Sequence, residues 1–332
     1  MITRKFLSKL IALIVGLLCL YIAYTHNLSK SFIYKGYAYG TSWSITTLNY
    51  LNDVHKSNIK DIINKIDYVA SNYKDDSEIA IINKNTSNSK LKISDDLFNI
   101  LSLAYEVEKL SNNAYDIKLG KISSNFGFAP DFNNKLDAKI DPESSYMLID
   151  KNTLTKQGDF WFDLSSIAKG YAVDMIVKYL EENNYKDFIV EIGGELTLSG
   201  SNYDKSWTIA IQDPLALDNK PAYLISPKNI NKISVATSGE YRNFKFDGAD
   251  KITHTINPIN GKSINNDALS VTVLSTVSSA HADAFATAFN VLSISESLDL
   301  ANNENIALML ITDGINGDNE FIFSNKWYDL TQ

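Results

Sequence analysis

Asp283 and Thr287 lie four residues apart in a segment whose pattern predicts a helix from Ala280 to Leu292. This spacing brings a carboxylate and a hydroxyl onto the same helix face, one turn apart. The neighbouring residues are mostly alanine, which leaves room for a bulky ligand. Because Mg²⁺ takes one or two protein oxygens and keeps its other positions for water and phosphate, the pair suits a magnesium site. Asp and Thr also occur at this spacing by chance, so this interpretation depends on other segments.

A second polar segment opens another predicted helix, Ser166–Glu182. We expect Asp163 or Ser165 to cap this helix, whose free N–H groups in the first turn would form a site for an anion. Lys169 adds a positive charge nearby. Considered alone, the segment is equally compatible with an ordinary capped amphipathic helix.

Two further segments combine small or polar residues with groups that bind phosphate or transfer protons. In the first, we predict that Thr237–Gly239 forms a loop that holds phosphate oxygens through backbone N–H and hydroxyl donors. In the second, His254 lies in a short predicted strand that ends at the turn Pro258–Gly261. A lone histidine in a strand is more often structural than catalytic, so its neighbours must decide between the two roles.

Glu191 and Glu195 flank a pair of glycines, Gly193 and Gly194. Paired glycines allow the backbone to approach a ligand or another strand closely. A tight turn accounts for them equally well. The sequence identifies no partner for either glutamate.

The overall composition limits the classes of function. The chain has 332 residues, of which 45% are hydrophobic and 21% charged, values that fit a globular protein with a sizeable core. The net charge is −8 and no basic run lies beyond the extreme N-terminus, which argues against nucleic acid as a partner. The sequence contains no Walker-type loop and no GxGxxG, GxSxG or HExxH motif.

The N-terminus has the composition of a targeting segment. Arg4, Lys5 and Lys9 surround the start of an apolar run that extends to residue 23. This arrangement predicts a signal peptide or membrane anchor over residues 1–30, and the lack of a clear cleavage site favours an uncleaved anchor. The positive-inside rule then places the rest of the chain on the periplasmic, extracytoplasmic side of the cell inner membrane.

Cys19 is the only cysteine and lies inside this apolar run. In a lipoprotein it would carry the lipid, but Leu18 is larger than the small residue that such processing normally requires. We therefore favour a thiol embedded in the membrane. Cysteine catalysis in the folded domain and a disulfide within the chain are both excluded.

Residues 31–332 are expected to form a single α+β domain, because strands and helices are mixed and no linker separates them. The predicted strands are Gly36–Leu48, Phe188–Ile192, Trp207–Ile211, Ser270–Leu274 and Ala307–Thr312. The predicted helices are Val54–Val69, a helix that Ser94 opens and that ends near Leu110, Ser166–Glu182 and Ala280–Leu292.

Taken in order, short segments of this chain resemble the FAD:protein FMN transferase (ApbE) family, from about residue 36 to residue 290. The matching segments are Gly40–Trp43, Ser71–Asn83, Ala114–Ile117, Asn125–Phe128, Asp163–Asp174, Val190–Leu196, Ala236–Arg242, His254–Gly261 and Ala282–Thr287. The chain departs from the family pattern at three positions. Asn257 stands where the family usually has Asp, Phe126 replaces the more usual Trp, and His281 is an unusual neighbour of the proposed metal pair.

The resemblance implies an extracytoplasmic enzyme that cleaves the pyrophosphate of FAD and attaches FMN to a Thr or Ser hydroxyl of a target protein. AMP is released and Mg²⁺ is required. The implied flavin contacts are Tyr39, Tyr73, Ala114, Tyr115, Asp116, Asp163, Lys169 and the His254–Ile256 strand, including Ile256. The implied metal ligands are Ser166 or nearby backbone, Asp283 and Thr287. The implied acceptors are membrane redox subunits that face the same side of the membrane.

The residue types suit this chemistry as well. Phosphoryl transfer depends mainly on positioning and on neutralising charge. Mg²⁺ on Asp283 and Thr287 would bridge pyrophosphate oxygens, while Lys169 would hold others. We expect His254 to accept the proton of the acceptor hydroxyl, and we assign Asp283 a catalytic role through the metal.

Two other functions would use the same pocket. An FAD-binding protein or FAD pyrophosphatase would pass the flavin phosphate to water and produce free FMN and AMP. A membrane-anchored binding module without catalysis would bind FAD whether or not Mg²⁺ is present, and the Asp283→Ala substitution would not affect it.

Overall fold

The computed structural model describes residues 4–28, 30–85, 90–128, 138–141, 143–216, 218, 220–227, 230–239, 244–247, 250–264, 266–314 and 317–331. Its centre is an eight-stranded sheet in the order β1-β2-β6-β7-β10-β13-β14-β15. These strands are β1 (Phe32–Ala38), β2 (Thr41–Thr47), β6 (Phe188–Ile192), β7 (Glu195–Ser199), β10 (Lys232–Gly239), β13 (Ala268–Ser275), β14 (Ala307–Asp313) and β15 (Asn319–Phe323). Every neighbouring pair is antiparallel.

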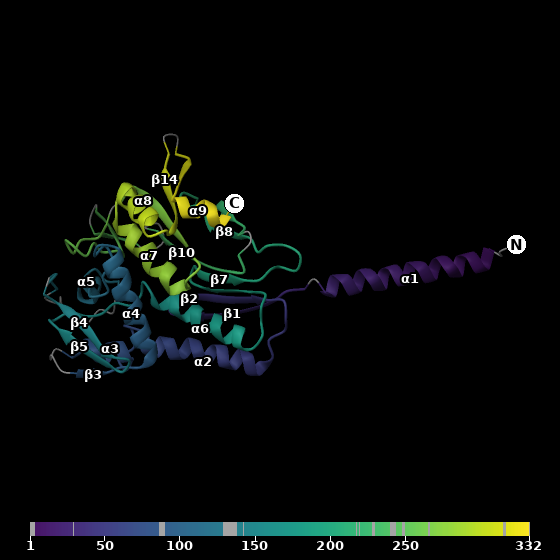
Figure 1. Ribbon diagram of the computed structural model, residues 1–332. Helices are drawn as coiled ribbons and strands as arrows, with labels where there is room; N and C mark the ends of the chain where they lie inside the picture. Colours follow the sequence, from purple (N-terminus) through teal and green to yellow (C-terminus); the bar gives the residue numbers. More distant parts are fainter. Residues whose placement is uncertain are drawn as a thin grey trace.

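Helices cover one face of this sheet (Figure 1). Helix α6 (Ala168–Glu182) packs on β6 and β7, and α7 (Ser279–Val291) packs on β10 and β13. Helix α2 (Asp53–Ala70) lies against α6, and α4 (Asp95–Leu110) lies against α7. The two inner helices are in direct contact with each other, so the start of α6 and the start of α7 meet above the middle of the sheet.

The other face is covered by the hairpin of β8 (Ile209–Gln212) and β9 (Pro221–Ile225) and by α9 (Asn325–Thr331). Strand β14 therefore has buried side chains on both sides. Leu308 and Leu310 belong to the core beneath the helices, whereas Met309 and Ile311 pack with Trp327 of α9. Burial on both faces explains why this segment is a continuous apolar run without alternation.

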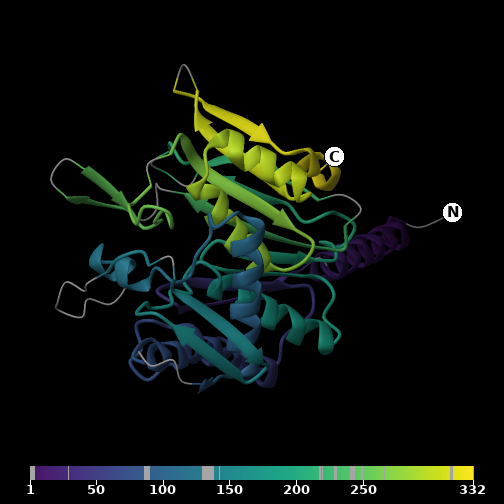
Figure 2. The same ribbon diagram turned by 60° about the vertical axis from the view of Figure 1, so that its left-hand side comes forward.

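Smaller elements surround the main sheet. A three-stranded sheet contains β3 (Lys90–Lys92), β5 (Thr153–Gln157) and β4 (Ser145–Asp150), and a two-stranded arm contains β11 (Phe244–Asp247) and β12 (Asp250–Thr253). Figure 2 shows this arm extending from the domain. The remaining helices are α3 (Glu78–Asn83), α5 (Gly120–Asn125) and α8 (Ile294–Asn303). The expectation of one mixed α+β domain is confirmed.

The N-terminal helix α1 (Arg4–Leu28) extends away from the domain in Figures 1 and 2. Within the described part of the chain, no helix combines the length and the apolar character that crossing a membrane requires. The predicted anchor over residues 1–30 stays a prediction.

Most predicted elements are confirmed to within a few residues, but Gly36–Leu48 is not one strand. It contains the end of β1, a turn and β2, so the two halves pair as a hairpin. Tyr39 (φ 52°) and Gly40 (φ 72°) both adopt the left-handed conformation that a tight two-residue hairpin turn requires. The predicted strand Trp207–Ile211 is also shifted, because β8 begins at Ile209.

Gly170 allows α6 and α7 to approach closely. A Cβ atom at this position would lie 2.6 Å from the carbonyl oxygen of Ser279 and 2.7 Å from the Cα of Ala280. Gly170→Ala is therefore expected to lower the free energy of unfolding by about 1–3 kcal/mol, the usual cost of overpacking a core. Urea unfolding followed by circular dichroism measures this loss, and an unchanged midpoint would contradict the close packing.

Candidate active site

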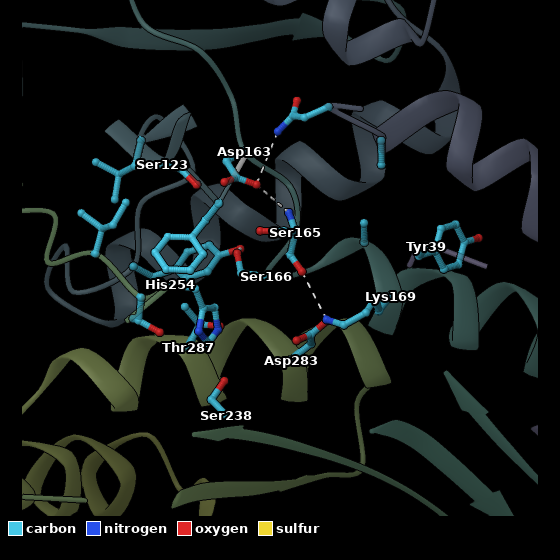
Figure 3. Close-up of a pocket in the computed structure, with 18 of the residues that line it drawn as sticks. Tyr39, Ser123, Asp163, Ser165, Ser166, Lys169, Ser238, His254, Asp283 and Thr287 are labelled. Carbon is cyan, nitrogen blue, oxygen red and sulfur yellow. Dashed lines mark hydrogen bonds and ion pairs between the residues drawn. The ribbon is translucent and has the colours of Figure 1, made fainter. Parts of the chain in front are cut away.

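A cavity of about 490 Å³ opens where the start of α6, the inner face of α7 and the β1–β2 turn meet (Figure 3). Its volume lies within the usual range for small-molecule sites. Every residue predicted as a site residue lines it: Tyr39, Tyr73, Ala114, Tyr115, Asp116, Asp163, Ser166, Lys169, His254, Ile256, Asp283 and Thr287. The fold therefore brings these residues together, while their individual roles remain predictions.

Helix α7 presents Asp283 and Thr287 to the cavity, as their spacing predicts. The helix is started by Ser278, whose hydroxyl accepts a hydrogen bond from the backbone N–H of His281 at 3.0 Å. Asp283 is almost fully buried, and its Oδ2 accepts a hydrogen bond from the Gly170 N–H at 3.1 Å. The start of α6 thus holds this carboxylate in place.

Lys169, Glu195 and Asp283 form a charged cluster in which both carboxylates are buried. The Lys169 Nζ lies 3.4 Å from Glu195 Oε1 and 3.6 Å from Asp283 Oδ2, and it donates a hydrogen bond to the Ser165 carbonyl at 3.2 Å. Two carboxylates therefore share one ammonium group. The three side chains come from α6, β7 and α7, so only the folded chain brings them into contact.

Burial and mutual contact shift the pKa values of this cluster. Burial raises the pKa of Glu195 above its ordinary value, although the nearby Lys169 opposes the shift. Burial likewise raises the pKa of Asp283 above its ordinary value. Burial disfavours the charged form of Lys169, yet its pKa is raised because Asp283 and Glu195 stabilise the ammonium. The cluster carries more negative than positive charge when all three groups are ionised, which favours binding of a further cation.

The start of α6 differs from the prediction. The helix begins at Ala168 instead of Ser166, and the residue before it, Ile167, offers no side-chain cap. The expectation that Asp163 or Ser165 caps this helix is wrong. Asp163 Oδ1 instead accepts the Ser165 N–H at 3.0 Å, which closes a local turn at the cavity wall. This local bond competes with helix formation, so the helix starts later.

Tyr115 and Asp116 form another part of the cavity wall. Tyr115 is buried, and its hydroxyl lies 3.0 Å from Ser166 Oγ. Burial raises the pKa of the Tyr115 hydroxyl, so this group stays protonated. Asp116 Oδ1 accepts the Lys118 N–H at 2.7 Å and lies 3.0 Å from Lys118 Nζ. Both side chains are therefore fixed before any ligand arrives.

His254 lines the cavity and lies immediately after β12, not inside a strand as predicted. The Phe128 ring stands edge-on to the imidazole, with centroids 6.3 Å apart. The backbone around Phe128 is held from two sides. Tyr73 donates a hydrogen bond to the Phe128 carbonyl at 2.8 Å, and Lys245 donates to the Gly127 carbonyl. Two segments distant in sequence thus hold the backbone that carries the Phe128 ring beside the histidine.

The predicted phosphate-binding loop Thr237–Gly239 is also corrected. These residues form the end of β10 and pair in register with β13 on one side, whereas the pairing of β10 with β7 ends at Val235. The segment is therefore a strand and not a loop, while phosphate binding by it stays a prediction. Thr237 Oγ1 lies 3.0 Å from Thr272 Oγ1 across the same pair. The segment still lines the cavity, and Figure 3 shows Ser238 beneath it. Residues 240–242 of the matching segment lie outside the described residues.

Glu195 is the main site residue that sequence reasoning did not assign. The available signal was the preceding glycine pair. A Cβ atom at Gly193 would lie 2.7 Å from Thr41 Cγ2 and 3.4 Å from Lys169 Cδ. Both interpretations of the glycine pair hold, because Gly193 (φ 64°) and Gly194 (φ 109°) form the two-residue turn between β6 and β7 and Gly193 also lies close to Thr41 and Lys169. The partner of Glu195 could not be read from the sequence, because Lys169 reaches it only through folding.

His281 is a partly buried titratable group at the start of α7. Its Nδ1 lies 3.2 Å from Ser275 Oγ, and its ring packs on Phe285 with centroids 4.6 Å apart. Burial lowers the pKa of His281 from 6.5 to about 4. The folded state thus disfavours the protonated imidazole, so this stabilisation is present above pH 6.5 and is lost as the pH falls toward 4.

The size of this pH effect can be tested with His281→Gln. Between pH 6.5 and 4, wild type is expected to lose about 3 kcal/mol of unfolding free energy through His281. The variant lacks this contribution and should therefore lose less over the same interval. Urea midpoints at intervals from pH 7.5 to 4, each compared with the same protein at pH 7.5, measure the difference. Parallel curves for the two proteins would contradict the buried neutral imidazole.

The amino-acid sequence matches one protein family, both by the family model and by its individual members. A model of the ApbE family matches residues 39–310. The FAD:protein FMN transferase of Haemophilus influenzae is 30% identical over 345 residues, covering 96% of this chain and 95% of that protein. The FAD:protein FMN transferase of Vibrio cholerae is 30% identical over 280 residues, covering 81% and 83%.

Solved structures share the fold. The flavin transferase ApbE from Vibrio cholerae has a TM-score of 0.77 at 27% identity and covers 91% of this chain and 99% of that one. The ApbE protein of Thermotoga maritima, at 21% identity, has a TM-score of 0.78 and covers 91% and 100%. The resemblance inferred from short segments is confirmed along nearly the whole domain.

Proposed function

This chain belongs to the ApbE family and is a flavin transferase, and we propose that its cavity transfers FMN from FAD to a Thr or Ser hydroxyl of a target protein, with Mg²⁺ bound and AMP released. The observation that carries the proposal is the convergence of Lys169, Asp283 and His254 on one cavity large enough for a nucleotide. Tyrosines in the wall supply flat apolar surfaces for a flavin ring.

The groups around Asp283 fit a magnesium ion. No cluster of three His, Cys, Asp or Glu side chains suited to a metal occurs among the described residues, so a cation here would use few protein ligands. Asp283 Oδ2 is engaged by Gly170 and Lys169, whereas its Oδ1 makes no hydrogen bond within the described chain. This oxygen and the hydroxyls of Thr287 and Ser166 are hard donors at the cavity wall. When bound, Mg²⁺ supplies charge neutralisation for the pyrophosphate.

The transfer itself is a displacement at phosphorus. The acceptor hydroxyl oxygen forms a bond to the phosphorus of the FMN half, the bond from that phosphorus to the bridging oxygen breaks, and AMP leaves with the electron pair. His254 accepts the hydroxyl proton, and Lys169 holds phosphate oxygens through charge. Because positioning dominates such reactions, the rigid wall of Tyr115 and Asp116 serves to fix the flavin end of the substrate.

The setting proposed for this reaction is the extracytoplasmic face of the inner membrane. It is supported by Arg4, Lys5 and Lys9 at the start of an apolar segment, which would stay on the cytoplasmic side. The acceptors proposed are flavin-carrying subunits of membrane redox complexes that face the same side. An anchored enzyme would meet such acceptors within the plane of the membrane.

One assay separates transfer from hydrolysis. The protein is incubated with FAD and MgCl₂, with and without an acceptor subunit whose Thr or Ser is replaced by Ala in a matched control. Transfer predicts covalent flavin fluorescence only on the unaltered acceptor, together with AMP in equal amount. Release of AMP and free FMN at the same rate without an acceptor would instead identify an FAD pyrophosphatase. The names of the relatives favour transfer.

A further inference from the structure

The Lys169 ammonium lies between the carboxylates of Glu195 and Asp283. Its Nζ is 3.4 Å from Glu195 Oε1 and 3.6 Å from Asp283 Oδ2, and neither contact has the length of a tight charge-assisted hydrogen bond. The Glu195 side chain is buried, and its Oε2 has no hydrogen-bond partner among the described residues. A buried carboxylate oxygen without a partner is costly, so this arrangement needs a reason.

We propose that Glu195 is a positioning residue that draws the Lys169 ammonium away from Asp283 and so keeps the Asp283 carboxylate available to Mg²⁺. The inference rests on the proposed function, because it presumes the magnesium site at Asp283. Without Glu195, Asp283 would be the remaining carboxylate beside Lys169. The ammonium would then move onto Asp283 and compete with the metal for the same carboxylate.

The sheet and α7 hold the two carboxylates of the cluster in place, so Lys169 is the side chain that can shift. Glu195 begins β7, which pairs with both β6 and β10 in the central sheet. Asp283 lies on α7, and the Gly170 N–H holds its Oδ2. The Lys169 side chain is long and keeps 25% of its surface exposed toward the cavity. A change in the balance of charges is therefore expected to shift the ammonium while both carboxylates stay in place.

The test measures binding of Mg²⁺ itself, by isothermal titration of each protein with MgCl₂ in the absence of FAD. Glu195→Gln keeps the size of the side chain and removes its charge. We expect its magnesium affinity to fall about tenfold, the lower end of the range for residues that orient metal ligands. Lys169→Met removes the competing cation and should bind magnesium at least as tightly as wild type.

The double variant decides whether Glu195 acts through Lys169. If it does, adding Glu195→Gln to Lys169→Met should leave the affinity for magnesium unchanged. An equal loss of affinity in both backgrounds would show a direct effect of charge and overturn the proposal. Wild-type affinity in Glu195→Gln would overturn it as well. If Glu195→Gln does not fold, Glu195→Asp, which keeps the charge on a shorter side chain, replaces it in the same cycle, with a smaller loss expected.

Glu191→Gln is the matched control, because Glu191 lies just beyond the same glycine pair. Its carboxylate accepts hydrogen bonds from the Gly194 N–H and the Ser44 hydroxyl and has no ion pair with Lys169 among the described contacts. Its magnesium affinity should equal that of wild type. Failure of wild type to bind magnesium would overturn the metal site of the proposed function together with this inference, whereas equal binding by wild type and Glu195→Gln would overturn this inference alone.

Discussion

Asp283→Asn is expected to abolish flavin transfer, with a fall in rate of roughly 1,000-fold or more, because the site loses the carboxylate that would hold magnesium beside the pyrophosphate. The substitution keeps an oxygen that can accept the Gly170 N–H, a bond of 3.1 Å in the folded protein. The fold should therefore survive. Covalent flavin on an acceptor protein, followed in a single turnover with saturating FAD and MgCl₂, measures the loss.

Two controls separate catalysis from folding in this experiment. Thermal unfolding of Asp283→Asn without ligands should follow a cooperative transition like that of wild type. Asp299→Asn, a change on α8 outside the cavity lining, should transfer flavin at the wild-type rate. Full transfer activity in Asp283→Asn would refute the metal-dependent mechanism.

His254→Ala is expected to lower the rate of transfer by roughly 100- to 10,000-fold while FAD binds with nearly unchanged affinity. A general base accelerates only the step in which the acceptor hydroxyl loses its proton. Its removal should therefore affect the chemical step far more than substrate binding. Single-turnover transfer rates and FAD affinity, measured by quenching of flavin fluorescence, give the two quantities separately.

The comparison for this variant is His55→Ala. His55 lies on α2, with its Nδ1 2.7 Å from the Tyr179 hydroxyl, and it does not line the cavity. His55→Ala should transfer flavin normally. Normal transfer by His254→Ala with unchanged FAD affinity would exclude His254 as the base. A large loss of FAD affinity would instead assign the imidazole to substrate binding.

Local signals explain which elements were predictable. Helix α7 was predicted as Ala280–Leu292 and found as Ser279–Val291, because its cap at Ser278 and its apolar spacing are both local. The segment Gly36–Leu48 was predicted as one strand from the alternation of residues 42–47, all of which lie after the turn. The left-handed backbone of Gly40 and of Tyr39, a conformation that tyrosine seldom adopts, divides it into a hairpin.

Competition between backbone partners overrode residue type elsewhere. Thr237–Gly239 has the hydroxyls and the glycine of a phosphate-binding loop, yet pairing with β13 makes it part of a strand. Near the start of α6, Asp163 has the side chain of a cap but bonds to the nearby Ser165 N–H instead. Both errors concern polar residues that can satisfy several backbone partners, and packing chooses among these partners.

The sequence alone determined the family, the mixed fold and many of the residues that line the cavity, because these depend on short segments and on local spacing such as that of Asp283 and Thr287. Only the tertiary structure decided how the residues act on one another. Gly170 meets Asp283 across a separation of 113 residues, and Lys169 lies between Glu195 and Asp283. Such contacts follow from the packing of α6 and α7 on the sheet, and periodicity within one element contains no information about them.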